Sequence, residues 1–247
     1  MSTPSPSLQH AHRSPTASPN TRAAGIAILL SAILSIVFVA LDPGASGKDA
    51  LSIMQSMVGI QQMHQVVHIV AMACLTGIMY GYTVFSQRLG LHRAPVLIGL
   101  ICYGLGTGLM LLGTVIDGFV STDTAALFVG GTPEAVKTGF WIIEVVSDVM
   151  LNDIARVAWV FQSAAAIAWS LALLPERGFH RAIGVVGLLA GALPAAAVFI
   201  AGSHITATVV VGILLVQAIW NIAAAALLLH GPRDASGGVA RQTLAAC

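Results

Sequence analysis

Six uninterrupted apolar runs, each long enough to cross a bilayer as a helix, constrain this chain more than any other feature of its sequence. The hydrocarbon core of a membrane is about 30 Å thick and needs ~20 apolar residues of helix. In lipid, backbone polar groups must be satisfied within the segment, and the runs lack the alternation of barrel strands. The sequence therefore predicts an all-α, polytopic membrane protein with a bundle of six transmembrane helices. They are expected at residues 23–41, 66–85, 96–116, 155–174, 182–201 and 207–229.

The composition agrees with a membrane protein and limits the kinds of partner that the chain is expected to bind. Hydrophobic residues make up 57% of the chain and charged residues only 9%, whereas about a quarter of a soluble domain is charged. A net charge of +1 offers no basic surface for nucleic acid. Three scattered cysteines are too few for a disulfide framework or a four-cysteine zinc site. The expected partners are the lipid bilayer and a small molecule or ion from the outer side, and no nucleic acid.

The positive charges predict the orientation of the bundle. Lys and Arg in short loops are retained on the cytoplasmic side. Eight of the eleven basic residues fall on the side that holds both termini: Arg13, Arg22, Arg88, Arg93, Arg177, Arg181, Arg233 and Arg241. The other side receives only Lys48 and Lys137, and Arg156 lies at the start of the fourth run. Both termini are therefore expected in the cytoplasm, and the chain is expected in the plasma (inner) membrane.

The chain divides into three parts. Residues 1–21 are rich in Ser and Pro and predict a disordered cytoplasmic tail, residues 22–230 the six-helix domain, and residues 231–247 a flexible cytoplasmic tail. Two outer segments, 42–65 and 117–154, are longer than connections require and contain helix-compatible stretches. The second of them has turn signals at Gly130-Gly131 and Thr132-Pro133. The second and fourth helices are therefore expected to project outward beyond the bilayer.

A stripe of polar and sulfur-bearing side chains runs along the helix that leads into the second span. Met54, Met57, Gln61, His64 and His68 recur at spacings of three and four, which places them on one face. Two histidines four residues apart can reach one metal ion from a single helical turn. The run reads HQVVH, without the Glu of the zinc-protease motif. The alternative is a pair of interfacial histidines hydrogen-bonded to neighbouring helices or lipid headgroups.

A second polar unit, Asn152, Asp153 and Arg156, lies at the start of the fourth run. An arginine at full membrane depth would cost about 3 kcal/mol even on the lenient insertion scale, so Arg156 is expected to pair with Asp153 or Asp117. Two interpretations stay open. The unit is either a salt bridge that fixes packing, or a substrate-binding group of Arg156, Asn152 and Asp153 in which Arg156 binds a carboxylate or phosphate. Asp153 is also the candidate catalytic residue.

Counting ~20 residues from each cytoplasmic end brings polar side chains from most of the helices to nearly one depth. These residues are Asp42, His64, His68, Asp117, Asp153, Arg156 and His204. Among them His64, His68, Asp117 and His204 are the predicted ligands of a divalent transition metal. The alternative is a polar rim, present because water begins at that level.

Three pairs of glycines four residues apart are expected to mark close helix contacts, and their faces could also support an oligomer. They are Gly77 with Gly81, Gly104 with Gly108, and Gly187 with Gly191.

Three functions fit these features. The first is a plasma-membrane protein with an outward-facing polar vestibule that binds a small molecule or ion, as a transporter or accessory component. The second is a metal-dependent enzyme acting at the outer leaflet, with Asp153 as general base. The third is a b-type haem held between His68 and His204. Inside the membrane the strongly polar side chains are mainly neutral (Gln162, Gln217 and Asn221), which argues against proton-coupled antiport.

Overall fold

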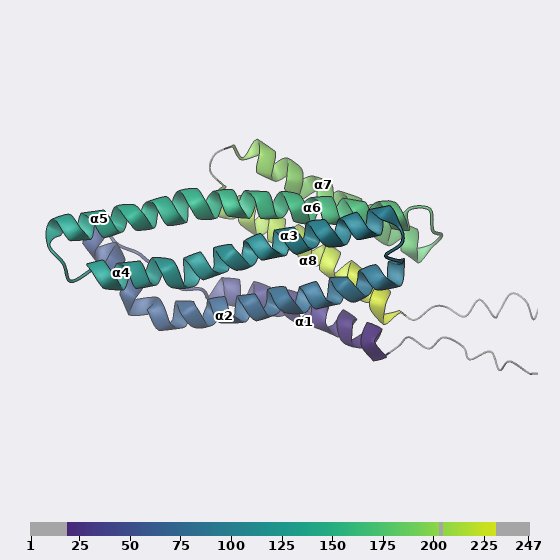
Figure 1. Cartoon of the computed structure of the whole chain (residues 1–247), viewed down its shortest axis with the longest axis horizontal. Coiled ribbons are helices and arrows are strands. Elements are labelled where there is room, and N and C mark those ends of the chain that lie inside the picture. Colours follow the sequence, from purple (N-terminus) through teal and green to yellow (C-terminus); the bar gives the residue numbers. More distant parts are fainter. Residues whose placement is uncertain (1–18, 203–204, 231–247) are drawn as a thin grey trace, which may run out of the picture.

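The computed structural model describes residues 19–202 and 205–230, and this part of the chain is helical without strands (Figure 1). Six of its helices are long and apolar enough to cross a membrane, which confirms the predicted all-α architecture. They are Asn20–Leu41, Ala50–Leu89, Ala94–Phe128, Pro133–Leu173, Phe179–Ile200 and Thr208–Leu229. The chain is therefore a multi-pass membrane protein. Of the two predicted tails, residues 1–18 and 231–247 lie outside the described residues, and residues 19–21 already belong to the first helix.

Two of the six spans are composite helices that contain a π-helical segment, η1 or η2. The elements in chain order are α1 (Pro19–Leu41), α2 (Ala50–Leu89), α3 (Ala94–Val115), η1 (Ile116–Ser121), α4 (Thr122–Phe128), α5 (Pro133–Glu144), η2 (Val145–Leu151), α6 (Asn152–Leu173), α7 (Phe179–Ile200) and α8 (Ala207–Leu229). The third span runs through α3, η1 and α4, and the fourth through α5, η2 and α6.

Three spans, not two, project beyond the rest of the bundle. Figure 1 shows α2, α4 and α5 extending past the ends of α1, α7 and α8. The second and fourth helices were expected to project, and the third does so as well, because the chain continues in η1 and α4 after Val115. The predicted turn after Phe128 is confirmed, since Thr132 caps α5 with its hydroxyl and Pro133 opens that helix. The projecting tip has its own small core of Met54, Ala125, Val136 and Ile143.

The start of α2 at this tip is also capped. The Asp49 side chain accepts a hydrogen bond from the Ser52 backbone N–H at 2.8 Å, and the Ser52 hydroxyl lies 3.1 Å from the Asp49 backbone N–H. This reciprocal arrangement is a capping box. The hydrogen bond from the Ser52 backbone lowers the pKa of Asp49, because it favours the charged carboxylate.

The fourth span is the most enclosed of the six, and its helix α6 packs between α3 and α7. Helix α1 lies against α2 and α8. The outward faces carry large exposed apolar side chains, as contact with lipid requires. Examples are Leu30, Ile101, Leu189 and Leu215, each more than half exposed.

Two of the three predicted glycine pairs lie at close helix contacts. A Cβ atom at Gly81 would come within 2.2 Å of Ile28, and one at Gly191 within 2.7 Å of the Ser163 carbonyl oxygen. The pair Gly104 and Gly108 was a wrong expectation. Within the described chain nothing lies within 4 Å of a Cβ at Gly108, and α3 approaches α6 at Gly106 instead. An oligomer formed through small-residue faces stays a prediction.

Two of the arginines that predict the orientation also complete helix C-termini, whose last carbonyl groups lack partners within the helix. Arg88 donates hydrogen bonds to the backbone oxygens of Leu227, Leu228 and His230 at the end of α8. Arg93 donates to the Ala172 oxygen near the end of α6 at 2.7 Å. Figure 1 shows that α1 begins and α8 ends at this same end of the bundle. That this end faces the cytoplasm stays a prediction.

Candidate functional site

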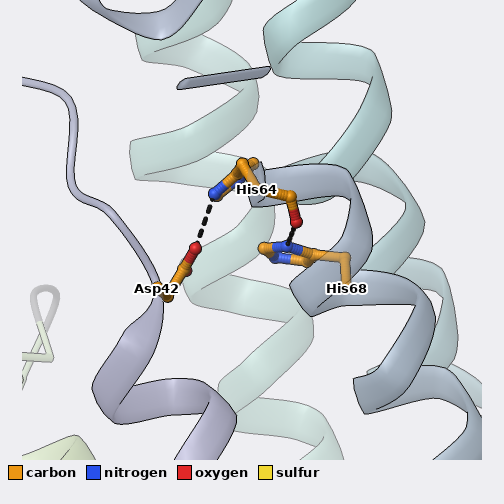
Figure 2. Close-up of side chains that lie close together, drawn as sticks. All are labelled: Asp42, His64 and His68. Atoms are coloured by element: carbon orange, nitrogen blue, oxygen red, sulfur yellow. Dashed lines mark hydrogen bonds and ion pairs between the residues drawn. The ribbon is translucent and has the colours of Figure 1, made fainter. Parts of the chain in front are cut away.

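Four side chains from three segments of the chain meet where the projecting tip joins the rest of the bundle. Asp42 directly follows α1, His64 and His68 lie one turn apart in α2, and Asp117 is the second residue of η1. Figure 2 shows the first three pointing toward one another. The two imidazole rings have centroids 4.2 Å apart, so the histidines share one face as their spacing predicts. We refer to Asp42, His64, His68 and Asp117 as the polar cluster.

Short polar contacts connect all four members of the polar cluster. Asp42 Oδ1 lies 2.8 Å from His64 Nδ1, and His68 Nδ1 lies 2.9 Å from the backbone oxygen of His64 (Figure 2). The other nitrogen of each ring faces Asp117. His68 Nε2 is 3.2 Å from Asp117 Oδ2, and His64 Nε2 is 4.0 Å from Asp117 Oδ1. The side chains of His64 and His68 are only 13% and 9% exposed, whereas that of Asp117 is 46% exposed.

The local backbone explains how His68 and Asp117 come so close. A Cβ atom at Gly118 would lie 2.5 Å from the Cβ and Cγ atoms of His68, so only glycine leaves room for the ring. Asp117 and Gly118 belong to a π-helical segment, a geometry that shifts side chains out of α-helical register and is frequent at functional sites. Segment η1 packs against η2, where the hydroxyls of Ser121 and Ser147 are 3.2 Å apart.

A cavity of about 370 Å³ reaches from the polar cluster into the membrane part of the bundle. Its wall is formed mainly by α1, α2, α3, α6 and α8, and includes Asp42, His68 and Asp117 at one end and Gln217 and Asn221 farther in. This volume lies within the range of small-molecule sites, which are mostly apolar with a few well-placed polar groups.

The inner part of the cavity wall contains neutral polar groups. Gln217 donates a hydrogen bond to Gln162 at 2.7 Å, and the Tyr82 hydroxyl donates to Asn221 at 2.6 Å. The predicted intramembrane polar residues Gln162, Gln217 and Asn221 therefore all line one cavity. Three further wall atoms, Ser163 Oγ, Trp159 Nε1 and Trp220 Nε1, are buried and have no hydrogen-bond partner among the residues that the structure describes. Unpaired buried polar atoms are costly, so a ligand group that pairs with them would gain affinity.

The residues of the second predicted unit lie elsewhere. Arg156 Nη1 is 3.7 Å from Asp153 Oδ1, as one interpretation expected, but the Asp153 side chain is 68% exposed. An ion pair this exposed contributes roughly 0.2–1 kcal/mol, so it does little to hold the bundle together. Within the described chain, the cavity wall includes neither of them, nor Asn152. Substrate binding by these three residues, and catalysis by Asp153, stay predictions.

One member of the predicted metal set falls outside the described residues. This is His204, so the structure describes neither the four-ligand set His64, His68, Asp117 and His204 nor a haem between His68 and His204. Of the set, three side chains come together, and Asp42 joins them. One ligand atom each from Asp42, His64 and His68 can be chosen so that all three lie within 4.8 Å of one another.

Sequence reasoning did not single out several residues of the site. Tyr103, Trp159 and Ser163 line the cavity, yet each sits inside an apolar run and carries little signal of its own. The available signal was that polar groups within a span face the interior of the bundle. Asp42 was placed at the right depth, but its position after the first run does not reveal that His64 is its partner.

Comparisons of the chain with protein-family models, with curated proteins and with solved structures give no match. A functional assignment therefore depends on the geometry of the cavity and of the polar cluster.

Proposed function

We propose that this chain is a membrane protein that binds a small amphiphile, with the apolar body of the ligand in the cavity and its polar end at the polar cluster. The observation that carries the proposal is the 370 Å³ cavity, which extends from Asp42, His68 and Asp117 to buried polar groups within the bundle. Since the basic residues predict that the polar cluster lies on the outer side, the ligand would be received from there. A transporter and an accessory component would both use such a site.

The distribution of charge along the wall supports a ligand of this kind. Among the described residues that line the cavity, the acidic and histidine side chains are all at the outer end. The middle is apolar, with residues such as Ala71 and Leu75, and the inner end offers neutral amide and hydroxyl groups. A charged molecule would be poorly solvated in the middle of this cavity, whereas an apolar chain would be well accommodated.

Photolabelling with a diazirine derivative of octanol tests the proposal. Wild-type protein in nanodiscs is expected to show saturable labelling of cavity-wall residues on α2, α3 and α6. Replacing Ala71, which lines the cavity, by Phe fills the space and is expected to reduce this labelling to background. The matched control is Ala73→Phe two residues along α2, because Ala73 faces outward. Labelling that is the same in all three proteins, or confined to outward-facing residues, would contradict the proposal.

A further inference from the structure

We infer that the polar cluster is a transition-metal site with three protein ligands: His64 Nε2, His68 Nε2 and the carboxylate of Asp117. In this assignment Asp42 is not a ligand but a positioning residue that orients the His64 ring. The inference goes beyond the proposed function and does not depend on what occupies the cavity.

The hydrogen bonds of His64 and His68 fix which nitrogen of each ring carries the hydrogen. A backbone carbonyl oxygen and a carboxylate oxygen only accept hydrogen bonds. His68 Nδ1, 2.9 Å from the His64 carbonyl oxygen, must therefore carry the hydrogen, and so must His64 Nδ1, 2.8 Å from Asp42 Oδ1. In a neutral imidazole the other nitrogen then has a free lone pair. Both Nε2 atoms are thus prepared as acceptors or as metal ligands.

Both of these lone pairs lie near the carboxylate of Asp117. His68 Nε2 is 3.2 Å and His64 Nε2 is 4.0 Å from oxygens of the same Asp117 carboxylate. Without a positive charge between them, lone pairs on nitrogen would face lone pairs on oxygen. A divalent ion bound by all three groups removes this repulsion. Metal bonds of about 2.0–2.1 Å in a tetrahedral site place ligand atoms roughly 3.4 Å apart. The two distances, which reach different oxygens of the carboxylate, lie on either side of that value.

The Nδ1 atom of each histidine also has a hydrogen-bond partner of the kind that supports metal ligands. Metal-binding histidines almost always donate their second N–H to a carboxylate or a backbone carbonyl, which fixes the ring and raises its basicity. His64 has the carboxylate of Asp42 in that position and His68 has a backbone carbonyl (Figure 2). If Asp42 were itself a ligand with His64 Nδ1, it would have to give up the 2.8 Å contact. The hydrogen-bond pattern therefore favours Asp117 as the ligand.

The ligand set also indicates the kind of site. Two imidazoles and one carboxylate suit Zn²⁺ or Fe²⁺. Three protein ligands leave at least one position open, and His68 and Asp117 are both on the wall of the cavity. The open position therefore faces water or the polar end of a bound molecule, as in metal sites that act on a ligand and unlike closed structural sites.

Zn²⁺ binding to the full chain in nanodiscs tests the assignment, measured by equilibrium dialysis with elemental analysis. All proteins carry His10→Asn and His12→Asn and no affinity tag, so that the two closely spaced histidines near the N-terminus do not contribute. One Zn²⁺ per chain is expected. Asp117→Asn removes a ligand and is expected to weaken binding more than about 100-fold, whereas Asp42→Asn keeps a hydrogen-bond acceptor and should cost about 10- to 100-fold.

The matched control is Asp123→Asn. Asp123 is a nearby carboxylate on α4 that accepts a hydrogen bond from Gln61 at 2.8 Å, and its replacement should leave Zn²⁺ affinity unchanged. Metal-free thermal melts show whether each variant is folded. If the protein with only His10→Asn and His12→Asn binds no Zn²⁺, the inference is overturned. The positive charge between His68 Nε2 and Asp117 would then be that of a proton on His68. A larger loss in Asp42→Asn than in Asp117→Asn would overturn the ligand assignment. Neither result would change the outcome of photolabelling, so failure of this inference is distinguishable from failure of the proposed function.

Discussion

Replacement of Gly106 by Leu is expected to prevent the bundle from folding, whereas the same replacement at Gly108 is expected to be tolerated. A Cβ atom at Gly106 would lie 2.8 Å from the backbone oxygen of Ala158 in α6. A backbone atom cannot rotate away, and α6 is held from its other side by α7. The whole α3–α6 contact would have to separate. We expect a cost of roughly 3 kcal/mol or more, at the upper end of overpacking effects.

The control for this prediction differs by two positions on the same helix. Gly108 faces outward, and no described atom lies within 4 Å of the place where its Cβ would be. Thermal unfolding followed by circular dichroism, with size-exclusion chromatography in the same detergent, measures both variants. Melting temperatures for Gly106→Leu and Gly108→Leu that agree within error would show that α3 and α6 do not meet at Gly106.

Replacement of Tyr82 by Ala is expected to lower the free energy of unfolding by about 3–5 kcal/mol, as for other large buried aromatic residues. Tyr82 has no exposed surface. Its ring stacks on Trp169 at a centroid distance of 4.7 Å and meets the edge of Phe85 at 5.9 Å. Since its hydroxyl also donates to Asn221, the substitution removes packing and leaves a polar atom without its partner.

Two further variants separate these contributions. Tyr82→Phe keeps the ring and removes the hydroxyl, so its expected cost is the roughly 1–3 kcal/mol of leaving Asn221 Oδ1 unpaired. Tyr80→Ala is the matched control, because Tyr80 lies two residues earlier on α2 and is 46% exposed. Chemical unfolding in mixed micelles gives the free energies. Equal destabilisation by Tyr80→Ala and Tyr82→Ala would mean that α2 faces the bundle differently.

The six spans could be predicted because each apolar run carries its signal locally. The continuation of the third helix could not, since Asp117, Gly118, Ser121 and Thr122 are residues that local propensity assigns to turns. In the structure their polar groups are satisfied within the helix. The Thr122 hydroxyl donates to the Gly118 oxygen at 3.1 Å, and the Ser121 hydroxyl is 3.3 Å from the Ile116 oxygen. Packing of α4 against α2 and α5 then stabilises the helical form.

The residues that make up the site could likewise be predicted only in part. Counting residues from the membrane surface predicts depth, and it placed Asp42, His64, His68 and Asp117 at one level. It does not predict direction around each helix axis. Arg156 was expected at the same depth, yet its position is outside the cavity wall of the described chain. Segment η2 precedes it, and a π-helical turn breaks the 3.6-residue period on which any helical-wheel projection depends.

The side-by-side segments η1 and η2 have a consequence for how this chain tolerates changes in length. In an α-helix the side-chain direction rotates around the helix axis by about 100° per residue. A one-residue deletion inside η1 would therefore rotate α4 relative to α3. Either Ala125 would then leave the core of the projecting tip, or Asp117 would move away from His64 and His68. An insertion or deletion in η1 or η2 thus changes the direction in which the side chains of the adjoining helix face. Its cost in stability depends on which of these side chains lose their contacts.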